Sequence, residues 1–454
     1  MGEFDLLVIG GGINGAGIAR DAAGRGLSVI LVEKDDLAAH TSSASSKLIH
    51  GGLRYLEQLD FRLVRESLTE REILLRAAPH IVEPLEFVVP MTPLSRPAWK
   101  IRTGLFLYDH LARRTLLPGS RSVALASDAR AEGLKTGIDR GFAYWDCKVQ
   151  DSRLVVLNAI DAAERGAVIA TRTKLLNARR EGARWVAQLR GPSGGSQSVT
   201  ARALVNAAGP WAGALLGLLT PNSNERRLRL VKGSHIVMPR LYPGDHAFLL
   251  QGRDGRVVFA IPFEQHFTLV GTTDVDCYGP PEDPAISKPE VEYLLDTISR
   301  TFTAQVSSRD IVWSFAGIRA LNDDGTGPAP KATREYALDL DAPEKTAPLL
   351  NVFGGKLTTY RRLSERAVDR LSEYFMNVGP PWTERACLPR RRHSQRKYRG
   401  LRRPPGAQLP FAPSCAHRAT GPHLRRKNRA AARWRSIDAG SRRMLRCGFI
   451  RQGS

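Results

Sequence analysis

The sequence predicts an α/β protein built on a parallel sheet, followed by a tail of different character. An apolar strand (5–9), a helix of small residues (15–25) and a second strand (28–32) follow one another within about 30 residues, which defines a βαβ unit with a right-handed crossover. Another apolar strand is expected at 203–207. With 454 residues and 42% hydrophobic content, the chain can bury a large core and is not mostly disordered.

Composition excludes several other classes of protein. No stretch approaches about 18 consecutive apolar residues, so no transmembrane helix is expected. The five cysteines show no CxxC pairing, which favours neither a zinc ribbon nor a disulfide scaffold, and we expect no metal site. The first residues, MGEFDLLVIGGG, enter a strand directly and do not resemble a signal peptide.

The remaining elements alternate between helix and strand. A charged helix is expected at 61–78, and the Pro- and aromatic-rich segment 79–118 is expected to be a less regular insertion. Strands return at 167–188, a hairpin turn at 193–198, an antiparallel pair at 257–261 and 267–270, and a helix at 361–371. We therefore expect a discontinuous nucleotide-binding domain (1–75, 142–230 and 312–388), an inserted mixed-sheet substrate domain (76–141 and 231–311) and a tail (389–454).

The net charge of +22 lies almost entirely in the tail, where 19 Lys and Arg face one acid, Asp438. The tail lacks apolar periodicity, so disorder is expected. Its richness in Arg is typical of GC-rich DNA translated in the wrong frame, which indicates an aberrant C-terminus; the rival reading is a basic arm for nucleic acid or membrane. A nucleic-acid-binding function has no other support, because the nearly neutral body carries no recognisable DNA- or RNA-reading motif.

A nucleotide fingerprint follows the first strand. In the segment from Gly10 to Gly15, Gly10 permits a tight turn, Gly12 lets the backbone approach a pyrophosphate, and Gly15 allows close packing of helix on strand. The N-terminus of the following helix favours phosphate. Glu33 ends the second strand, where its carboxylate can accept hydrogen bonds from a ribose. The fingerprint alone does not separate NAD from FAD.

Two later segments favour a long cofactor with a flat ring. The hydroxyl-rich stretch 41–47 can wrap such a cofactor, and the pair Gly51–Gly52 allows close approach to a ring. In the segment 353–360, FGGKLTTY, glycines and threonines precede a helix, whose N-terminus can stabilise negative charge on a reduced flavin.

Taken together, these stretches resemble the FAD-dependent glycerol-3-phosphate dehydrogenases of the bacterial aerobic, respiratory type. The resemblance covers about 1–388 and is carried by IGGGINGAGIARDAAGRGLSV (9–29), TSSASSKLIHGGLRYLE (41–57), RPAWKIRTGLFLYDHL (96–111), LVNAAGPWA (204–212), KGSHIV (232–237), GTTDV (271–275) and FGGKLTTYR (353–361). It implies a Rossmann-like FAD-binding domain of the glutathione-reductase and D-amino-acid-oxidase type. The family's helical C-terminal domain is replaced here by the basic tail.

The resemblance also implies an activity and its partners: oxidation of sn-glycerol 3-phosphate to dihydroxyacetone phosphate, with FAD taking the hydride and ubiquinone the electrons. It implies peripheral attachment to the cytoplasmic face of the inner membrane, and a homodimer. The residues it places at the substrate are His50, Arg54, Tyr55, His235, Thr272, Arg319 and Lys356. Those it places at FAD are Gly10, Gly12, Asn14, Gly15, Glu33, Thr41, Ser45, Ser46, Lys47, Gly209, Gly354, Gly355, Leu357 and Thr358.

The chemistry of these residue types assigns roles to some of them. Arginine holds phosphate oxygens bidentately and stays charged, so Arg54 and Arg319 are expected to hold the phosphate. Either His50 or His235 could be the base that takes the hydroxyl proton, and the sequence does not rank them. Lys356 could stabilise the developing alkoxide.

Two further readings remain open. The same fingerprint opens related flavin oxidases and dehydrogenases that act on an amine or a 2-hydroxy acid, although HGGLRY together with FGGKLTTYR favours a phosphate. The chain could also be an inactive relic that keeps its site residues but loses the support of the C-terminal domain.

Overall fold

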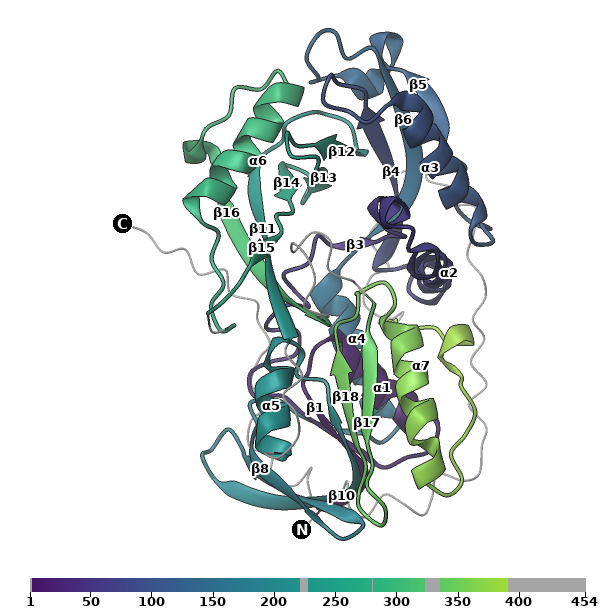
Figure 1. Ribbon diagram of the computed structural model, residues 1–454, viewed down its shortest axis with the longest axis vertical. Helices are drawn as coiled ribbons and strands as arrows, with labels where there is room; N and C mark the ends of the chain where they lie inside the picture. Colours follow the sequence, from purple (N-terminus) through teal and green to yellow (C-terminus); the bar gives the residue numbers. More distant parts are fainter. Residues whose placement is uncertain (1, 221–227, 280, 323–334, 391–454) are drawn as a thin grey trace, which may run out of the picture.

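The computed structural model describes residues 2–220, 228–279, 281–322 and 335–390. Of the expected tail (389–454), residues 391–454 lie outside the described residues. The described helices are α1 (Ile13–Gly24), α2 (Phe61–Ala77), α3 (Ala98–His110), α4 (Asp151–Glu164), α5 (Ala212–Leu219), α6 (Lys288–Thr301) and α7 (Tyr360–Leu371). The chain forms two sheets, one above the other in Figure 1.

The first sheet is the predicted parallel sheet. Its strands are β1 (Gly2–Ile9), β2 (Val29–Val32), β7 (Val168–Ala170), β8 (Lys174–Glu181), β9 (Arg184–Arg190), β10 (Ser196–Asn206), β17 (Ala337–Asp341) and β18 (Leu349–Phe353). The central order is β17-β18-β10-β1-β2-β7, with β18, β10, β1, β2 and β7 parallel. Helices α1, α4 and α7 contact one another and cover one face, where Leu6, Val8, Ile18 and Leu363 are buried.

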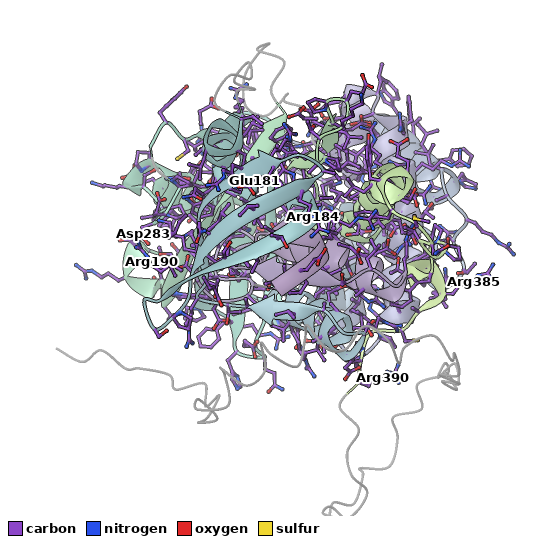
Figure 2. All side chains as sticks on the ribbon, turned by 90° about the horizontal axis from the view of Figure 1, so that it is seen from below. Glu181, Arg184, Arg190, Asp283, Arg385 and Arg390 are labelled. Carbon is purple, nitrogen blue, oxygen red and sulfur yellow. The ribbon has the colours of Figure 1, made fainter. Side chains whose placement is uncertain are left out.

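The other face of this sheet is covered by α5 and by the hairpin of β8 and β9. Trp185 fills the space beneath the hairpin and donates its indole N–H to the carbonyl of Pro348, 2.9 Å away. Figure 2 looks onto this end of the molecule, with Glu181 and Arg184 labelled on either side of the hairpin turn. The guanidinium of Arg184 pairs with Glu3 at 2.6 Å, which ties the hairpin to β1.

The second sheet is mixed. Its strands are β3 (Leu48–Ile49), β4 (Val82–Pro90), β5 (Arg121–Ala124), β6 (Arg140–Val149), β11 (Leu228–Pro239), β12 (Ala247–Gln251), β13 (Val257–Phe263), β14 (Phe267–Gly271), β15 (Val275–Asp276) and β16 (Trp313–Asn322). The order is β15-β11-β14-β13-β12-β4-β6-β3, with β16 on β11 and β5 on β6. The predicted antiparallel pair is confirmed as β13 and β14.

Helices cover both faces of the second sheet. α2 and α3 lie on one side, where Ile101, Leu105 and Tyr108 are buried against Phe87 and Tyr144. α6 covers the other side and begins with a capping box between Ser287 and Glu290.

Two sequence expectations differ from this fold. The segment 79–118 is regular, because β4 pairs along its length with β6 and α3 buries an apolar stripe. The strands β6 and β16, which the expected domain boundaries assign to the nucleotide-binding domain, belong to the second sheet. No helix within the described ranges is both long enough and apolar enough to cross a bilayer.

Candidate active site

Two adjoining cavities lie at the carboxyl ends of β1 and β10, where open parallel sheets bind ligands. The first cavity, of about 290 Å³, extends between the two sheets. The second cavity, of about 300 Å³, lies at the outer end of β2. Their walls share Gly12, Thr41, Ser42, Ala207, Gly209 and Pro210. Because they adjoin along this wall, the two cavities together form an elongated site, the channel, that suits an extended ligand.

The glycine-rich turn brings the backbone close to this channel. Gly10 has φ +113°, and a Cβ there would lie 2.4 Å from the carbonyl oxygen of Ala207. A Cβ at Gly15 would lie 1.9 Å from the carbonyl oxygen of Gly10, which confirms its role in close packing. Gly12 is the N-cap residue of α1 and lines both cavities, as Ile13 and Asn14 line the first, so the positive end of the helix borders the channel.

Asn14 joins this turn to the distant 353–360 segment. Its Nδ2 donates to the carbonyl of Gly354 at 3.1 Å. Its Oδ1 is buried and has no hydrogen-bond partner within the described part of the chain. Asn14 lines the first cavity, so this acceptor is available to a ligand there.

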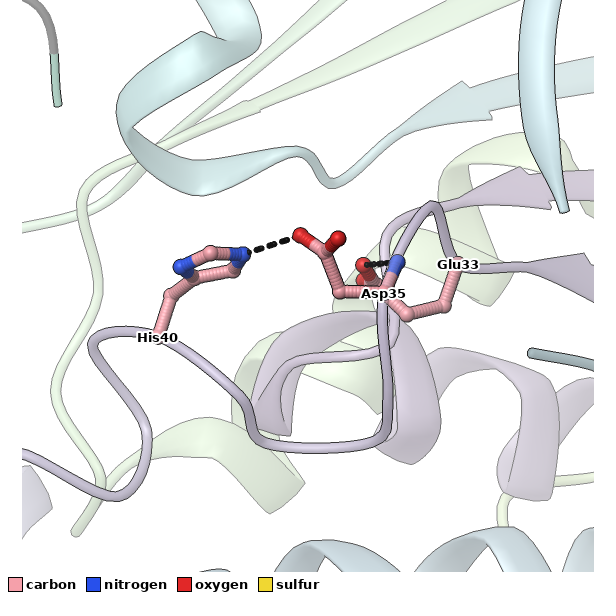
Figure 3. A group of neighbouring side chains, drawn as sticks. All are labelled: Glu33, Asp35 and His40. Carbon is pink, nitrogen blue, oxygen red and sulfur yellow. Dashed lines mark hydrogen bonds and ion pairs between the residues drawn. The ribbon is translucent and has the colours of Figure 1, made fainter. Parts of the chain in front are cut away.

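Glu33 lies in the wall of the second cavity, as expected for a nucleotide-binding acid. Its two carboxylate oxygens accept the backbone N–H groups of Gly11 at 2.6 Å and Asp35 at 2.8 Å. Figure 3 shows Glu33 beside Asp35 and His40, with His40 Nε2 2.7 Å from an Asp35 oxygen. The ammonium of Lys34 also reaches Asp35, at 2.5 Å. The carboxylates of this cluster thus already bind a cation and backbone donors, and Glu33 lies beside Gly10 in the wall of the second cavity.

The hydroxyl-rich segment 41–47 wraps the junction of the two cavities. Thr41 donates to the carbonyl of Ile318 at 2.7 Å, and Ser45 and Ser46 line the first cavity. Lys47 does not line either cavity: its ammonium bonds Asp151 at the start of α4, 2.9 Å away. Ser42, which the sequence analysis did not single out, accepts the backbone N–H of Ile13 at 3.0 Å.

The HGGLRY and FGGKLTTY segments meet across the first cavity. The backbone N–H of His50 donates to Thr358 Oγ1 at 3.2 Å, and the same hydroxyl donates to the carbonyl of His50 at 3.3 Å. Lys356 places its ammonium over the ring of Tyr55, 4.3 Å from the ring centroid. These contacts hold two chain segments that are 300 residues apart in one wall.

The two expected phosphate arginines converge on one carboxylate, that of Asp274. Arg54 Nη1 lies 3.1 Å from one Asp274 oxygen, and Arg319 Nη1 lies 2.5 Å from the other. Arg319 Nη2 also donates to Thr272 Oγ1 at 2.9 Å. Asp274 was missed as a site residue; its only sequence signal was its place in the GTTDV segment.

The structure separates the two candidate histidines. His50 lines the first cavity, whereas His235 does not: its Nε2 is 2.9 Å from Ser46 Oγ and its ring stacks on Phe315. Desolvation, with the charge of neighbouring cations, lowers the pKa of both histidines to about 3; among the cations, Lys356 has the largest effect on His50. Both rings are therefore neutral near pH 7, and of the two histidines it is His50 that borders the first cavity.

Most of the expected residues are brought together. The first cavity is lined by His50, Arg54, Tyr55, Thr272, Arg319 and Lys356 and by Gly12, Asn14, Thr41, Ser45, Ser46, Gly209, Gly354, Gly355, Leu357 and Thr358. The second cavity is lined by Gly10, Gly12, Glu33, Thr41 and Gly209. Gly15, Lys47 and His235 line neither cavity.

These features suit a dinucleotide with a planar ring: a helix N-terminus whose N-cap residue is a glycine, a backbone cradle that a Cβ at Gly10 would fill, and an unpartnered Asn14 oxygen. Residues 5–387 match the model of the family described as FAD-dependent oxidoreductase (DAO). The chain therefore belongs to this family of flavin enzymes.

Several curated relatives are more specific. The chain is 54% identical over 386 residues to glycerol-3-phosphate dehydrogenase of Pseudomonas aeruginosa, covering 85% of this chain and 75% of that protein. It is 50% identical to the aerobic glycerol-3-phosphate dehydrogenase of Escherichia coli, covering 86% and 77%. It is also 51% identical to D-erythritol 1-phosphate dehydrogenase of Brucella abortus, covering 85% and 77%.

Solved structures agree with this placement. The fold is similar to glycerol-3-phosphate dehydrogenase from Bacillus halodurans complexed with FAD, with a TM-score of 0.65 and 29% identity over 85% of this chain and 68% of that one. It is similar in fold to L-α-glycerophosphate oxidase from Mycoplasma pneumoniae with FAD bound, with a TM-score of 0.66 and 18% identity over 86% of this chain and all of that one.

Proposed function

We propose that this chain oxidises sn-glycerol 3-phosphate to dihydroxyacetone phosphate. The observation that carries the proposal is the charge of the first cavity, where the described lining residues include Arg54, Arg319 and Lys356 against a single carboxylate, Asp274. This excess of two positive charges matches a phosphate monoester dianion. The names of the relatives at 50% and 54% identity support the same substrate.

The reaction divides between the cofactor and the side chains. Bound in the channel, FAD would supply the acceptor for the hydride that leaves the carbinol carbon. Arg54 and Arg319 bind the phosphate and so orient that carbon, which turns binding energy into alignment. His50, neutral near pH 7, takes the hydroxyl proton, and the ammonium of Lys356 stabilises the oxygen as negative charge develops on it.

A phosphorylated four-carbon polyol is the second candidate substrate. The relative that acts on D-erythritol 1-phosphate is 51% identical to this chain, between the values for the two glycerol-3-phosphate dehydrogenases. Both substrates carry the same phosphate group, so the arginines alone do not distinguish them. Discrimination falls to the walls that face the rest of the substrate.

For the electron acceptor we propose ubiquinone, with the protein attached peripherally to the cytoplasmic face of the inner membrane, as a homodimer. The support for a membrane is the outward face of α3, at the edge of the molecule in Figure 1. Trp99 and Phe106 lie seven residues apart on this face and are 71% and 54% exposed. Arg102 is exposed between them. An aromatic and basic helix face suits an anionic bilayer surface.

A steady-state assay with a soluble quinone analogue tests the activity. We expect a higher kcat/KM for glycerol 3-phosphate than for D-erythritol 1-phosphate. Without quinone, the rate of hydrogen peroxide release should be small compared with the rate of quinone reduction.

Arg319→Ala should raise KM for glycerol 3-phosphate far more than for glycerol. Equal effects on both substrates would remove Arg319 from the phosphate role, and preference for the erythritol ester would select the second candidate.

Sedimentation with vesicles tests the membrane contact. The full chain should bind vesicles that contain phosphatidylglycerol, and the double variant Trp99→Ser, Phe106→Ser should bind them several-fold more weakly while keeping activity toward the soluble quinone. Replacing the exposed Met376, 82% exposed on a different segment, is the matched control. Equal binding by the α3 variant and the control would exclude this face.

A further inference from the structure

A buried polar network lies directly behind the loop that carries His50 and Arg54. The backbone N–H of Gly51 donates to the hydroxyl oxygen of Tyr108 at 2.8 Å and reaches an oxygen of Asp146 at 3.4 Å. Tyr108 in turn donates its hydroxyl hydrogen to Asp146, 2.7 Å away. Gly51 therefore sits at the end of a hydrogen-bonded chain that leads away from the cavity.

Arg71 completes the network. Its Nη1 donates to Asp146 at 2.7 Å and to the carbonyl of Trp145 at 2.9 Å. Arg71, Tyr108 and Asp146 come from α2, α3 and β6, so three separate elements converge behind one peptide. All three side chains are buried, and Asp146 is only 1% exposed.

Placing these groups in the interior is costly for folding. A buried ion pair gains little net stability over apolar residues of similar volume, because desolvation offsets the attraction. Neither Arg71, Tyr108 nor Asp146 lines either cavity, so none of them contacts a ligand there. The network instead holds the backbone amide of Gly51 in place.

The fit around Gly51 leaves little freedom. A Cβ at this position would lie 2.6 Å from both the Tyr108 hydroxyl and a methyl group of Leu68. On the cavity side, Thr358 holds the neighbouring residue His50 through its N–H and carbonyl groups. The peptide is thus clamped from both sides, between the proposed base and the proposed phosphate ligand Arg54.

We propose that Tyr108, oriented by Asp146 and Arg71, is a positioning residue that fixes the Gly51 peptide and thereby aligns His50 and Arg54 with the substrate. The inference rests on the proposed function for its assay. It concerns different residues from the proposed function, because none of the three network residues lines a cavity.

The test replaces the Tyr108 hydroxyl by hydrogen in Tyr108→Phe, which keeps the ring and removes the acceptor for Gly51. We expect kcat/KM for glycerol 3-phosphate to fall roughly 10- to 100-fold, because a small misplacement of reacting groups costs that much. The deuterium isotope effect with substrate labelled at the carbinol carbon should rise, since misalignment slows hydride transfer relative to other steps. Protection against thermal unfolding by inorganic phosphate should weaken, since Arg54 is displaced.

Tyr242→Phe is the matched control. Tyr242 is equally buried, and its hydroxyl donates to the carbonyls of His246 and Ala260 in the second sheet, away from both cavities. This variant should lose comparable stability and leave the isotope effect and the phosphate protection unchanged. Kinetics of Tyr108→Phe that match those of Tyr242→Phe would overturn the proposal.

If Tyr108→Phe does not fold, Arg71→Lys carries the test. It keeps the positive charge but loses the planar guanidinium, whose Nη1 holds both Asp146 and the Trp145 carbonyl. The same shifts in isotope effect and phosphate protection are expected, and wild-type values in Arg71→Lys would contradict the proposal. Failure of the wild-type enzyme to oxidise glycerol 3-phosphate would instead reject the proposed function, which the wild-type arm measures separately.

Discussion

At the residue scale, the feature that most shapes the site is the carboxylate of Asp274. It separates two guanidinium groups that would otherwise repel each other, and its side chain is only 4% exposed. The arginines are thereby set in place before substrate arrives. The family resemblance pointed to Arg54 and Arg319, and the chemistry of phosphate gave them a role, but neither pointed to Asp274, the residue that orients them.

Asp274→Asn should raise KM for glycerol 3-phosphate roughly 10-fold or more and change kcat less, measured by steady-state kinetics. The amide keeps one acceptor oxygen, which can hold one arginine. Its NH₂ group is a donor and cannot bind the second guanidinium, which is also a donor, so one arginine must move. The gain in positive charge does not compensate, because the displaced arginine no longer meets the phosphate. The matched control is Asp276→Asn, two residues further on, where Asp276 pairs with Arg229 at 2.6 Å. Equal KM values for the two variants would contradict this role.

Two histidines, buried His235 and cavity-lining His50, give the protein a defined acid sensitivity. The folded state lowers the pKa of His50 and His235 from 6.5 to about 3, so below pH 6.5 the unfolded chain binds more protons than the folded one. The contribution of these two lowered pKa values to the free energy of unfolding is fully present above pH 6.5 and is lost as the pH falls toward 3. In that pH range each histidine lowers the free energy of unfolding by about 1.4 kcal/mol for every unit by which the pH falls. Urea unfolding of His235→Gln between pH 7 and 4.5 should show a shallower loss than wild type, and parallel slopes would refute the assignment.

At the scale of single elements, the glycine turn before α1 was predictable and the segment 79–118 was not. The turn is local, because strand, glycines and helix follow one another in the sequence. The strand β4 acquires its partner β6 from about 60 residues away, and α3 shows aromatic and basic residues on the side that it does not bury. The sequence pattern of 79–118 therefore suggested an irregular insertion. The pairing of β4 with β6, which makes the segment regular, cannot be recognised from the local sequence.

Gly10→Ala tests the turn. The new Cβ would meet the carbonyl oxygen of Ala207 at 2.4 Å on a backbone with φ +113°, so the turn must open and FAD binding should be lost. Gly26→Ala is the control, because Gly26 also has positive φ (+92°) but no atom lies within 4 Å of its Cβ position. We expect that variant to lose some stability and keep its flavin, as judged by the visible absorption of the purified proteins. Full flavin content in Gly10→Ala would contradict the assignment of the turn.

At the scale of the whole molecule, the site exists because two sheets meet over one channel. The first sheet supplies the glycine turn and Glu33, and the second supplies Thr272 and Arg319, so neither sheet holds the site alone. Sequence motifs identified most of these residues as members of a family. The distances between them depend on long-range contacts such as those of His50 with Thr358. Only the folded structure shows these contacts.

The central claim is that FAD lies along this channel with a phosphorylated alcohol held beside it by Arg54 and Arg319. Anaerobic titration of the FAD-loaded full chain with glycerol 3-phosphate tests it most directly. The account predicts that substrate bleaches the oxidised flavin spectrum and that quinone restores it. A protein that cannot take up FAD, or a bound flavin that keeps its oxidised spectrum in excess glycerol 3-phosphate, would contradict it.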